Sequence, residues 1–211
     1  DMLWKTKECQ KLGTKLMHIY SDEWEYKRFI CKSMIKNRLG LCEKVWARKC
    51  VIKEINKKDF DLFINASHIS GSVNSSVRLG LFYKDELVSA MGFRKPRQKK
   101  WSGYYEISRF ATKLNTVVVG GLGKFIKYFN KKFDFSIMTY ADRRFGEGLG
   151  YGKVGFKYYG ETGIDYWYSD GRQRYDRFIV KTEKGKCERE KAAELGLYKV
   201  WGCGSNIWVL I

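Results

Sequence analysis

The chain has 211 residues, of which 44% are hydrophobic and 16% aromatic; this excludes an intrinsically disordered chain and predicts a packed core. Its 41 lysine and arginine residues outnumber 23 acidic residues and give a net charge of +18. Such an excess favours polyanionic partners, because each neutralised phosphate releases counterions. No apolar run approaches the roughly 18 residues of a membrane span, and no signal-peptide layout is visible, so we expect a cytoplasmic protein with no membrane partner.

The first 48 residues are predicted to form a helix, a strand and a second helix. A polar helix over Thr6–Leu12 precedes a short apolar strand over Lys15–Tyr20. Ser21 then offers an N-cap, and apolar residues recur at helical spacing as far as Arg38. His18 lies inside the apolar strand, so we expect it to be a core histidine whose hydrogen bonds are satisfied.

From Lys49 onward the pattern predicts alternating strands and helices. Lys84-Asp85 separates two strand-like segments and predicts a tight hairpin turn, and Pro96 begins a basic loop. The expected strands are Cys50–Ile55, Val77–Tyr83, Glu86–Phe93, Tyr104–Thr112, Phe135–Tyr140, Gly155–Tyr159, Tyr166–Tyr168 and Asn206–Leu210. The expected helices are Lys57–Asn65, one that runs to about Lys132 after a glycine-rich turn, Tyr151–Val154 and Glu188–Leu195.

The six cysteines contain no Cys-x-x-Cys pair, which a zinc ribbon or finger normally needs to place two thiolates on one turn. We therefore expect reduced thiols that belong to the core or are incidental, with a structural zinc held by scattered cysteines as the alternative. They are Cys9, Cys31, Cys42, Cys50, Cys187 and Cys203.

The order of elements over residues 50–170 resembles the GCN5-type acetyltransferase superfamily. Two segments carry the resemblance: the turn Gly120-Gly121-Leu122-Gly123 before a helix, and Tyr151-Gly152-Lys153-Val154-Gly155-Phe156. It implies an α+β fold with an acetyltransferase-like central mixed sheet flanked by helices, preceded by a small N-terminal α/β segment. It also implies that the backbone N–H groups of Gly120, Gly121 and Gly123 hold the pyrophosphate of acyl-CoA. Valine or threonine replaces the arginine or glutamine that usually opens this motif.

A second series resembles the phage Mom-type DNA-modification proteins, which share the acetyltransferase fold and alter adenine amino groups. It comprises Ser67-His68-Ile69-Ser70-Gly71-Ser72, Tyr105-Glu106-Ile107-Ser108-Arg109-Phe110 and Thr139-Tyr140-Ala141-Asp142. Similar domains occur in phage homing-endonuclease-like proteins. The resemblance implies iron or zinc as an alternative to acyl-CoA, and the host cytoplasm as the location.

Three consecutive segments are expected from these resemblances. Residues 1–48 resemble the end of a very-short-patch-repair-like nuclease domain, without the part that would hold its active site. Residues 49–170 form the acetyltransferase-like domain, and residues 171–211 form a basic C-terminal extension.

His68 and Asp142 are the principal catalytic candidates. His68 lies in a loop of small residues, where it could act as a general base, and Asp142 follows a strand at its carboxyl end, where open α/β folds place ligands. Together they could form an open metal site. Two simpler interpretations stay open: a loop histidine bonded to the backbone, and an aspartate in a helix cap or surface ion pair.

Glu106 and Tyr105 complete the set of catalytic candidates. Glu106 and Arg109 lie three residues apart on a strand, so we expect them on opposite faces, one toward the site and the other toward solvent or the partner layer. Tyr105 and Tyr140 could stack on a flipped base or belong to the core.

Basic residues close to aromatic residues predict contacts with nucleic acid, chiefly DNA. A lysine-rich solubilising surface is the alternative. The candidates are Arg94, Lys95, Arg97, Lys99, Lys100, Arg109, Arg143, Arg144, Arg172 and Arg174.

The leading hypothesis is a phage-type, DNA-acting enzyme that modifies a base amino group, with His68 and Asp142 activating the nucleophile or holding a metal. One alternative is a non-catalytic DNA-binding module derived from a homing endonuclease. The other is a CoA-dependent N-acetyltransferase.

Overall fold

The computed structural model describes residues 2–180 and 187–211, and its internal contacts divide the chain into two compact units. Unit 1 comprises Asp1–Tyr26, Ala141–Gly148 and Gly160–Asn206. Unit 2 comprises Lys27–Tyr140, Leu149–Tyr159 and Ile207–Ile211. Each unit is therefore built from segments that are far apart in the sequence.

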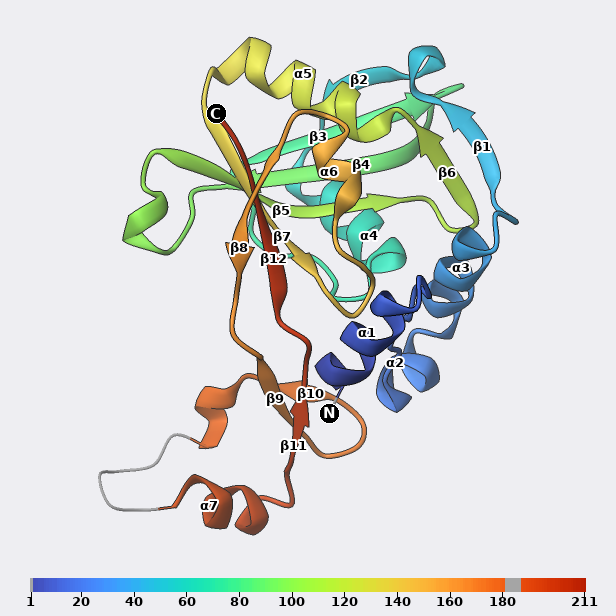
Figure 1. Ribbon diagram of the computed structural model, residues 1–211. Coiled ribbons are helices and arrows are strands. Elements are labelled where there is room, and N and C mark those ends of the chain that lie inside the picture. Colours follow the sequence, from blue (N-terminus) through green and yellow to red (C-terminus); the bar gives the residue numbers. More distant parts are fainter. Residues whose placement is uncertain (1, 181–186) are drawn as a thin grey trace. The chain divides into compact units, whose positions relative to one another are not determined.

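A seven-stranded sheet, whose strands lie mainly in unit 2, has the order β2-β3-β4-β5-β7-β12-β8 (Figure 1). Neighbouring strands from β2 to β5 are antiparallel, whereas β5 and β7 are parallel, so the sheet is mixed. The strands are β2 (Val51–Glu54), β3 (Val77–Tyr83), β4 (Glu86–Arg94), β5 (Tyr104–Thr112), β7 (Ser136–Asp142), β8 (Lys157–Glu161) and β12 (Ser205–Leu210).

Local sequence explains most of this sheet. Lys84 and Asp85 both adopt positive φ, which gives the β3–β4 hairpin a turn whose twist matches its strands. The last strand, β12, lies between β7 and β8, so residues from the C-terminal end complete the sheet. The predicted α+β class, with a central mixed sheet flanked by helices, is confirmed.

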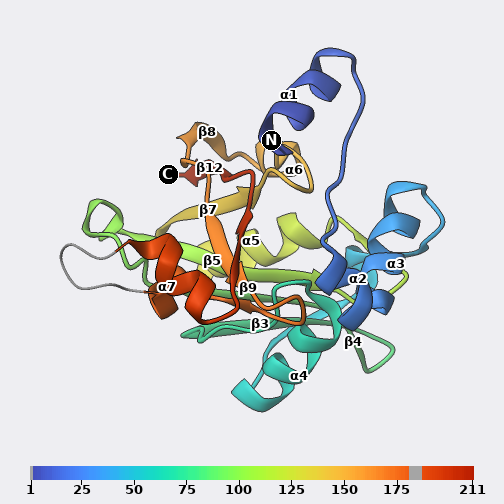
Figure 2. The ribbon, with the colours of Figure 1, turned by 90° about the horizontal axis from the view of Figure 1, so that it is seen from below.

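Two amphipathic helices cover the two faces of this sheet (Figures 1 and 2). α4 (Lys57–Ser67), capped by the Asn56 side chain, buries Phe60 and Ile64 against Ala111 of β5. α5 (Gly121–Phe133) places its aromatic side chains against Phe110 on the opposite face. The face that α4 covers is called the α4 face below.

Unit 2 also contains two strands that the local sequence pattern does not predict. β1 (Glu43–Trp46) pairs in parallel with β6 (Thr116–Val119). The remaining helices of unit 2 are α3 (Arg28–Arg38), α6 (Leu149–Gly152) and two 3-10 turns, η1 (Ala47–Lys49) and η2 (Lys99–Trp101). The single helix predicted from Ser21 to Arg38 is wrong, because Lys27 leaves helical geometry at φ −128° and ψ 33°.

Unit 1 contains α1 (Met2–Lys11), α2 (Ser21–Tyr26) and a small sheet in the order β10-β9-β11. Buried Tyr168, Val180 and Ala192 form its core. The predicted strand over Lys15–Tyr20 is wrong, because this segment pairs with none of the described strands. The other elements are β9 (Tyr166–Ser169), β10 (Arg174–Tyr175), the 3-10 turn η3 (Arg177–Val180), α7 (Glu188–Glu194) and β11 (Tyr198–Trp201).

All six cysteines are free thiols. Among the residues that the structure describes, no helix is long and apolar enough to cross a membrane.

Candidate functional site

A β-bulge in β5 shapes the α4 face of unit 2. Ile107 pairs with Phe93 and Arg109 pairs with Gly92, so Ser108 is an extra residue on β5. A bulge of this kind interrupts the alternation of side chains along the strand. Ser108 Oγ lies 2.7 Å from Ser75 Oγ, and a Cβ on Gly92 would touch Phe60 of α4 and the Ser108 hydroxyl, which places Ser108 on the α4 face.

The bulge brings Glu106 and Arg109 to the same face, which corrects the expectation of opposite faces. Glu106 pairs across the ladder with Arg94, and Arg94 Nη2 donates to Glu106 Oε1 at 2.7 Å. Only 8% of Glu106 is exposed. Burial, followed by the negative charge of Glu106, raises the pKa of Tyr140 on β7, so this phenol stays protonated. Glu106 therefore presents an ion-paired carboxylate with a phenol nearby.

His68 is the C-cap residue of α4, and its backbone N–H donates to the Ile64 carbonyl. Its ring Nδ1 accepts a hydrogen bond from the Ser70 amide at 3.1 Å, which leaves the ring proton on Nε2. Burial, together with the charges of Arg109 and Lys27, lowers the pKa of His68 to about 4. At neutral pH the imidazole thus offers a donor, Nε2–H, rather than the free acceptor nitrogen of a general base.

Arg109 connects β5 to the loop that follows His68. Its Nε donates to the Gly71 carbonyl at 2.6 Å, and its Nη1 donates to the Ser108 carbonyl at 2.8 Å. Burial and the neighbouring charge of Arg94 lower the pKa of Arg109 below its ordinary value, although a guanidinium remains charged at neutral pH. His68, Glu106 and Arg109, three residues chosen from the sequence, thus share the α4 face of one unit.

The parallel pairing of β5 with β7 ends at this polar face. It covers only three residue pairs and stops at Glu106 opposite Met138, although β5 continues to Thr112 and β7 to Asp142. Beyond Glu106, no described strand forms a ladder with the backbone edge of β5 that faces β7. An edge of this kind can accept an extended ligand through main-chain hydrogen bonds.

The glycine-rich turn leads into α5 as predicted. Gly120 adopts φ 79°, a conformation that favours glycine, and a Cβ on Gly121 would lie 3.1 Å from Val118. A Cβ added to Gly123 would lie 3.4 Å from the Val154 side chain. Lys124 turns its ammonium to the carbonyls of residues 47 and 50, so the cation is occupied within the protein. The backbone N–H groups of the first helical turn are the donors that remain for an anion.

Tyr105 lies on the α5 face, apart from the polar residues of the α4 face. Its ring contacts Phe129 and Phe135, and Lys95 Nζ lies 4.0 Å from the Tyr105 ring centroid and 4.1 Å from that of Phe135. The other cations of this loop, Arg97, Lys99 and Lys100, are exposed. The loop therefore combines cations with aromatic rings, as the sequence predicted.

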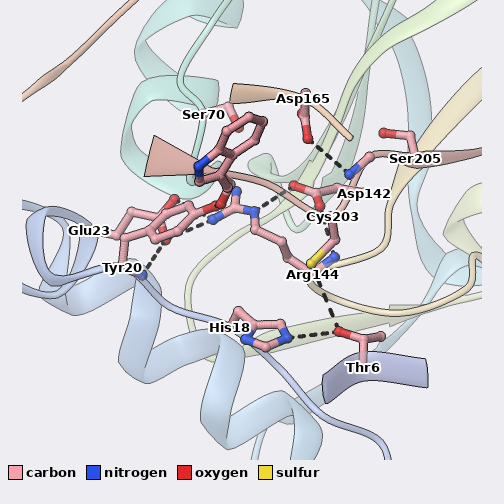
Figure 3. Close-up of polar contacts among 12 residues, drawn as sticks. Thr6, His18, Tyr20, Glu23, Ser70, Asp142, Arg144, Asp165, Cys203 and Ser205 are labelled. Atoms are coloured by element: carbon pink, nitrogen blue, oxygen red, sulfur yellow. Dashed lines mark hydrogen bonds and ion pairs between the residues drawn. The ribbon is translucent and has the colours of Figure 1, made fainter. Parts of the chain in front are cut away.

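Asp142 belongs to unit 1, where it takes part in a buried ionic network (Figure 3). The Arg144 amide and Nε donate to the two carboxylate oxygens of Asp142 at 2.9 and 3.0 Å. Arg144 Nη1 donates to both oxygens of Glu23, which is only 2% exposed. Burial raises the pKa of Asp142 even though Arg144 opposes the shift. Asp142 thus acts as a partner of Arg144, which agrees with the ion-pair interpretation.

Three arginines predicted to contact nucleic acid are bound to carboxylates of unit 1. Arg174 donates to Asp22 at 2.9 Å and to Glu23 at 2.6 Å. Arg143 donates to the Glu161 carboxylate and the Thr162 carbonyl, and both Arg143 and Arg144 are buried. These contacts correct the expectation that they meet phosphate. Arg172, by contrast, is exposed.

The remaining predictions fall on separate parts of the chain. His68 lies in unit 2 and Asp142 in unit 1. No group of three His, Cys, Asp or Glu side chains that could hold a metal occurs in residues 2–180 and 187–211. His18, expected to be a satisfied histidine in a core strand, is half-buried outside the described strands, and its Nε2 is hydrogen-bonded to Thr6 Oγ1 at 2.8 Å. Glu23 was missed, because nothing in its own segment indicates a partner 121 residues away.

No protein-family model matches the chain, and no curated protein matches its sequence. Among solved structures, it is similar to a Bacillus subtilis acetyltransferase in complex with CoA, at 16% identity and a TM-score of 0.43 over 77% of this chain and 98% of the other. It is also similar to a GNAT family acetyltransferase from Elizabethkingia anophelis with acetyl-CoA bound, at 15% identity and a TM-score of 0.43 over 77% of this chain and 97% of the other. A third similar structure is an acetyltransferase of the GNAT family from Streptococcus pneumoniae, at 11% identity and a TM-score of 0.46 over 76% of this chain and 98% of the other.

Proposed function

We propose that the chain is an acyl-CoA-dependent N-acyltransferase whose acceptor binds on the α4 face of unit 2. One observation carries this proposal: the β5–β7 pairing ends at Glu106, and the bulge that follows places Ser108 and Arg109 beside the same carboxylate. A buried, ion-paired carboxylate at the point where two strands separate is suited to proton transfer.

Two backbone features fit acyl-CoA. The N–H groups that begin α5 would hold its phosphates, and the open edge of β5 beyond Glu106 would hold its amide-containing arm. Because Lys124 is bound to carbonyls, the fit relies on backbone donors rather than on a phosphate-binding lysine. When bound, the cofactor supplies an acyl group activated as a thioester.

The side chains of the α4 face would handle the proton of the acceptor amine. Glu106 would accept it, and Arg94 would orient the Glu106 carboxylate through the 2.7 Å hydrogen bond. Tyr140, with its raised pKa, remains a hydrogen-bond donor at neutral pH. His68 would serve as a second donor through Nε2–H, because its Nδ1 is already bound to the Ser70 amide.

A transfer assay tests this proposal. Free thiol released from acetyl-CoA is followed with a panel of amines: amino acids, polyamines, lysine peptides and DNA. Glu106→Gln keeps the shape of the side chain but removes the base, so we expect at least about a 100-fold loss of kcat with unchanged acetyl-CoA affinity. A Glu106→Gln protein that retains the rate of the original chain would contradict the role of Glu106.

Nucleic acid is the second partner that we propose, supported by the exposed cations of the loop at 95–100 and by Lys95 between two aromatic rings. This feature favours a second candidate function, modification of a base amino group in DNA. Mass spectrometry of DNA from cells that express the chain tests it: a base adduct would support DNA as the acceptor. Unmodified DNA together with tight binding would support a binding role only.

A further inference from the structure

The α4 face of unit 2 carries more cationic than anionic groups. Arg78, Arg94 and Arg109 lie on it; Glu106 is bound to Arg94, and the charge of Arg78 acts on Asp61 of α4. The described residues place no carboxylate within 4.0 Å of the Arg109 nitrogens; its hydrogen bonds go to the carbonyls of Gly71 and Ser108. Glu106 acts on this guanidinium through its charge, but it is hydrogen-bonded to Arg94 rather than to Arg109.

His68 adds a second donor near this charge. The positive charges of Arg109 and Lys27 both act on its ring, and its Nδ1 is used by the Ser70 amide. The remaining ring group is Nε2–H, which can only donate. The loop links Arg109 to His68 through Gly71: Arg109 Nε donates to the Gly71 carbonyl, and the Gly71 amide donates to the His68 carbonyl at 2.9 Å.

We propose that His68 and Arg109 bind an oxyanion, a phosphate or carboxylate group, of the acceptor substrate. A guanidinium and a neutral imidazole N–H together match an oxyanion, because bonds from a charged donor to a charged acceptor are stronger than neutral ones. Anion binding by this pair is independent of acyl transfer, whereas its role as an acceptor site rests on the proposed function.

The position of the pair relative to Glu106 specifies the substrate class. Glu106 and Arg109 lie on one face of β5, separated along the strand by Ile107 and the bulge residue Ser108. An acceptor whose oxyanion binds Arg109 would present a neighbouring amine toward Glu106. The acceptor would thus be an amine that also carries a phosphate or carboxylate, either as a free small molecule or within a nucleic acid.

A structural role for Arg109 makes a different prediction, and Arg78 provides the matched control. Arg78 Nη1 donates to the Ser75 carbonyl of the same loop, just as Arg109 Nε donates to that of Gly71. Arg78→Gln and Arg109→Gln therefore remove the same charge and the same kind of loop contact. If Arg109 binds the anion, Arg109→Gln weakens anion binding more than Arg78→Gln does. If both arginines only support the loop, the two variants have the same effect.

Nuclear magnetic resonance of the ring nitrogens tests the site, because the chain contains only two histidines. His18→Gln assigns the signals. The full chain is titrated at neutral pH with inorganic phosphate, with acetate and with a short oligothymidylate. We expect the His68 signals to shift saturably while those of His18 stay fixed, and the pKa of His68 to rise from about 4 when phosphate is bound.

The variants decide the outcome. We expect Arg109→Gln to weaken anion binding at least about tenfold, the factor that corresponds to about 1.4 kcal/mol, and Arg78→Gln to retain it. Phosphate binding tighter than acetate binding would identify a phosphate site, and a preference for the oligonucleotide would place that phosphate in nucleic acid. His68 signals that never move, or equal affinities in Arg109→Gln and the original chain, would overturn the site. Acetyl-CoA affinity, measured separately, reports on the proposed function instead.

Discussion

The two units divide the charge of the chain unequally. Unit 2 contains 26 of the 41 basic residues and 8 of the 23 acidic residues, so the whole net charge of +18 belongs to it. Unit 1 contains 15 of each kind and is neutral. A polyanionic partner should therefore be attracted to unit 2, although along the sequence the basic residues are spread over the entire chain.

Arginine side chains have different partners in the two units. In unit 1, Arg144 is bound to Glu23 and Asp142, and Arg174 to Glu23 and Asp22, so these cations stabilise the fold. In unit 2, Arg109 is bound to carbonyls, and the carboxylate that acts on its charge, Glu106, is hydrogen-bonded to Arg94 instead. A count of arginines therefore indicates a binding surface only when the partners of each guanidinium are known.

The largest effect that we predict is on the network of unit 1. The side chain of Glu23 is 1% exposed, and its carboxylate pairs with Arg144 and Arg174. Glu23→Gln removes the negative charge from both ion pairs, which should destabilise unit 1 by about 3–5 kcal/mol. Hydrogen exchange of α2, compared with that of α4 in unit 2, measures the effect. Lys113→Gln, which breaks the exposed ion pair with Glu86, is the control and should cause no measurable change. Equal protection of α2 in Glu23→Gln and the original chain would show that the network is not stabilising.

The same carboxylate predicts how unit 1 responds to acid. Burial opposes ionisation of Glu23, but Arg144, the Tyr20 amide and Arg174 outweigh it and lower its pKa below 4.5. Because the pKa of Glu23 is lower in the folded than in the unfolded protein, its ionised form stabilises unit 1 above about pH 4.5. This stabilisation is lost as the pH falls through the pKa of the folded state. Exchange of α2 should accelerate in that range, and Glu23→Gln should remove this pH dependence. Acid sensitivity that persists in the variant would assign it to other groups.

A smaller effect is expected at the bulge of unit 2. A Cβ on Gly92 would lie 2.6 Å from both the Phe60 ring and Ser75 Oγ, so Gly92→Ala should cost about 1–3 kcal/mol and displace the polar face. Gly103→Ala is the control, because no described atom lies within 4 Å of its added Cβ. Urea unfolding with acetyl transfer as a second readout compares the two. Loss of stability in both variants alike would argue against close packing at Gly92.

The smallest expected effect concerns the division of charge. Changing Lys99 and Lys100 together to glutamine should weaken binding to single-stranded DNA and reduce the slope of log affinity against log salt by about 0.7 for each phosphate that is no longer neutralised. The same double change at Lys5 and Lys7, exposed lysines of unit 1, should leave affinity and slope nearly unchanged. Fluorescence anisotropy at several salt concentrations measures both. A greater reduction of affinity by the unit 1 pair would reverse the comparison.

Much of unit 2 could be predicted from the sequence, because its elements are specified locally. Alternation predicted β3, β4 and β5, the Lys84-Asp85 turn predicted the hairpin, and helical periodicity predicted α4 and α5. Unit 1 could not be predicted from local patterns, because its segments come from the N-terminal part of the chain and from two separate stretches of its second half. The Lys15–Tyr20 segment shows the difference: its apolar pattern predicts a strand, yet no described strand pairs with it.

The candidate site was predicted as single residues rather than as an arrangement. His68, Glu106 and Arg109 were selected from the sequence, but a bulge leaves no clear pattern of residue types, so their shared face could not be foreseen. Asp142 was selected with His68, although the two belong to different units. The hydrogen bond from the Ser70 amide to His68 Nδ1, which fixes the imidazole as a donor, depends on loop conformation alone.

Calorimetry with acetyl-CoA tests the central claim, an acyl-CoA site in unit 2, most directly. Leu122 lies in the first turn of α5, where Leu122→Asp favours the helix dipole but repels phosphate, and Leu122→Asn is the uncharged match. We predict micromolar or tighter binding to the original chain, at least about tenfold weaker binding to Leu122→Asp, and a smaller reduction in Leu122→Asn. No heat of binding to the original chain, or equal affinities in all three proteins, would contradict the claim.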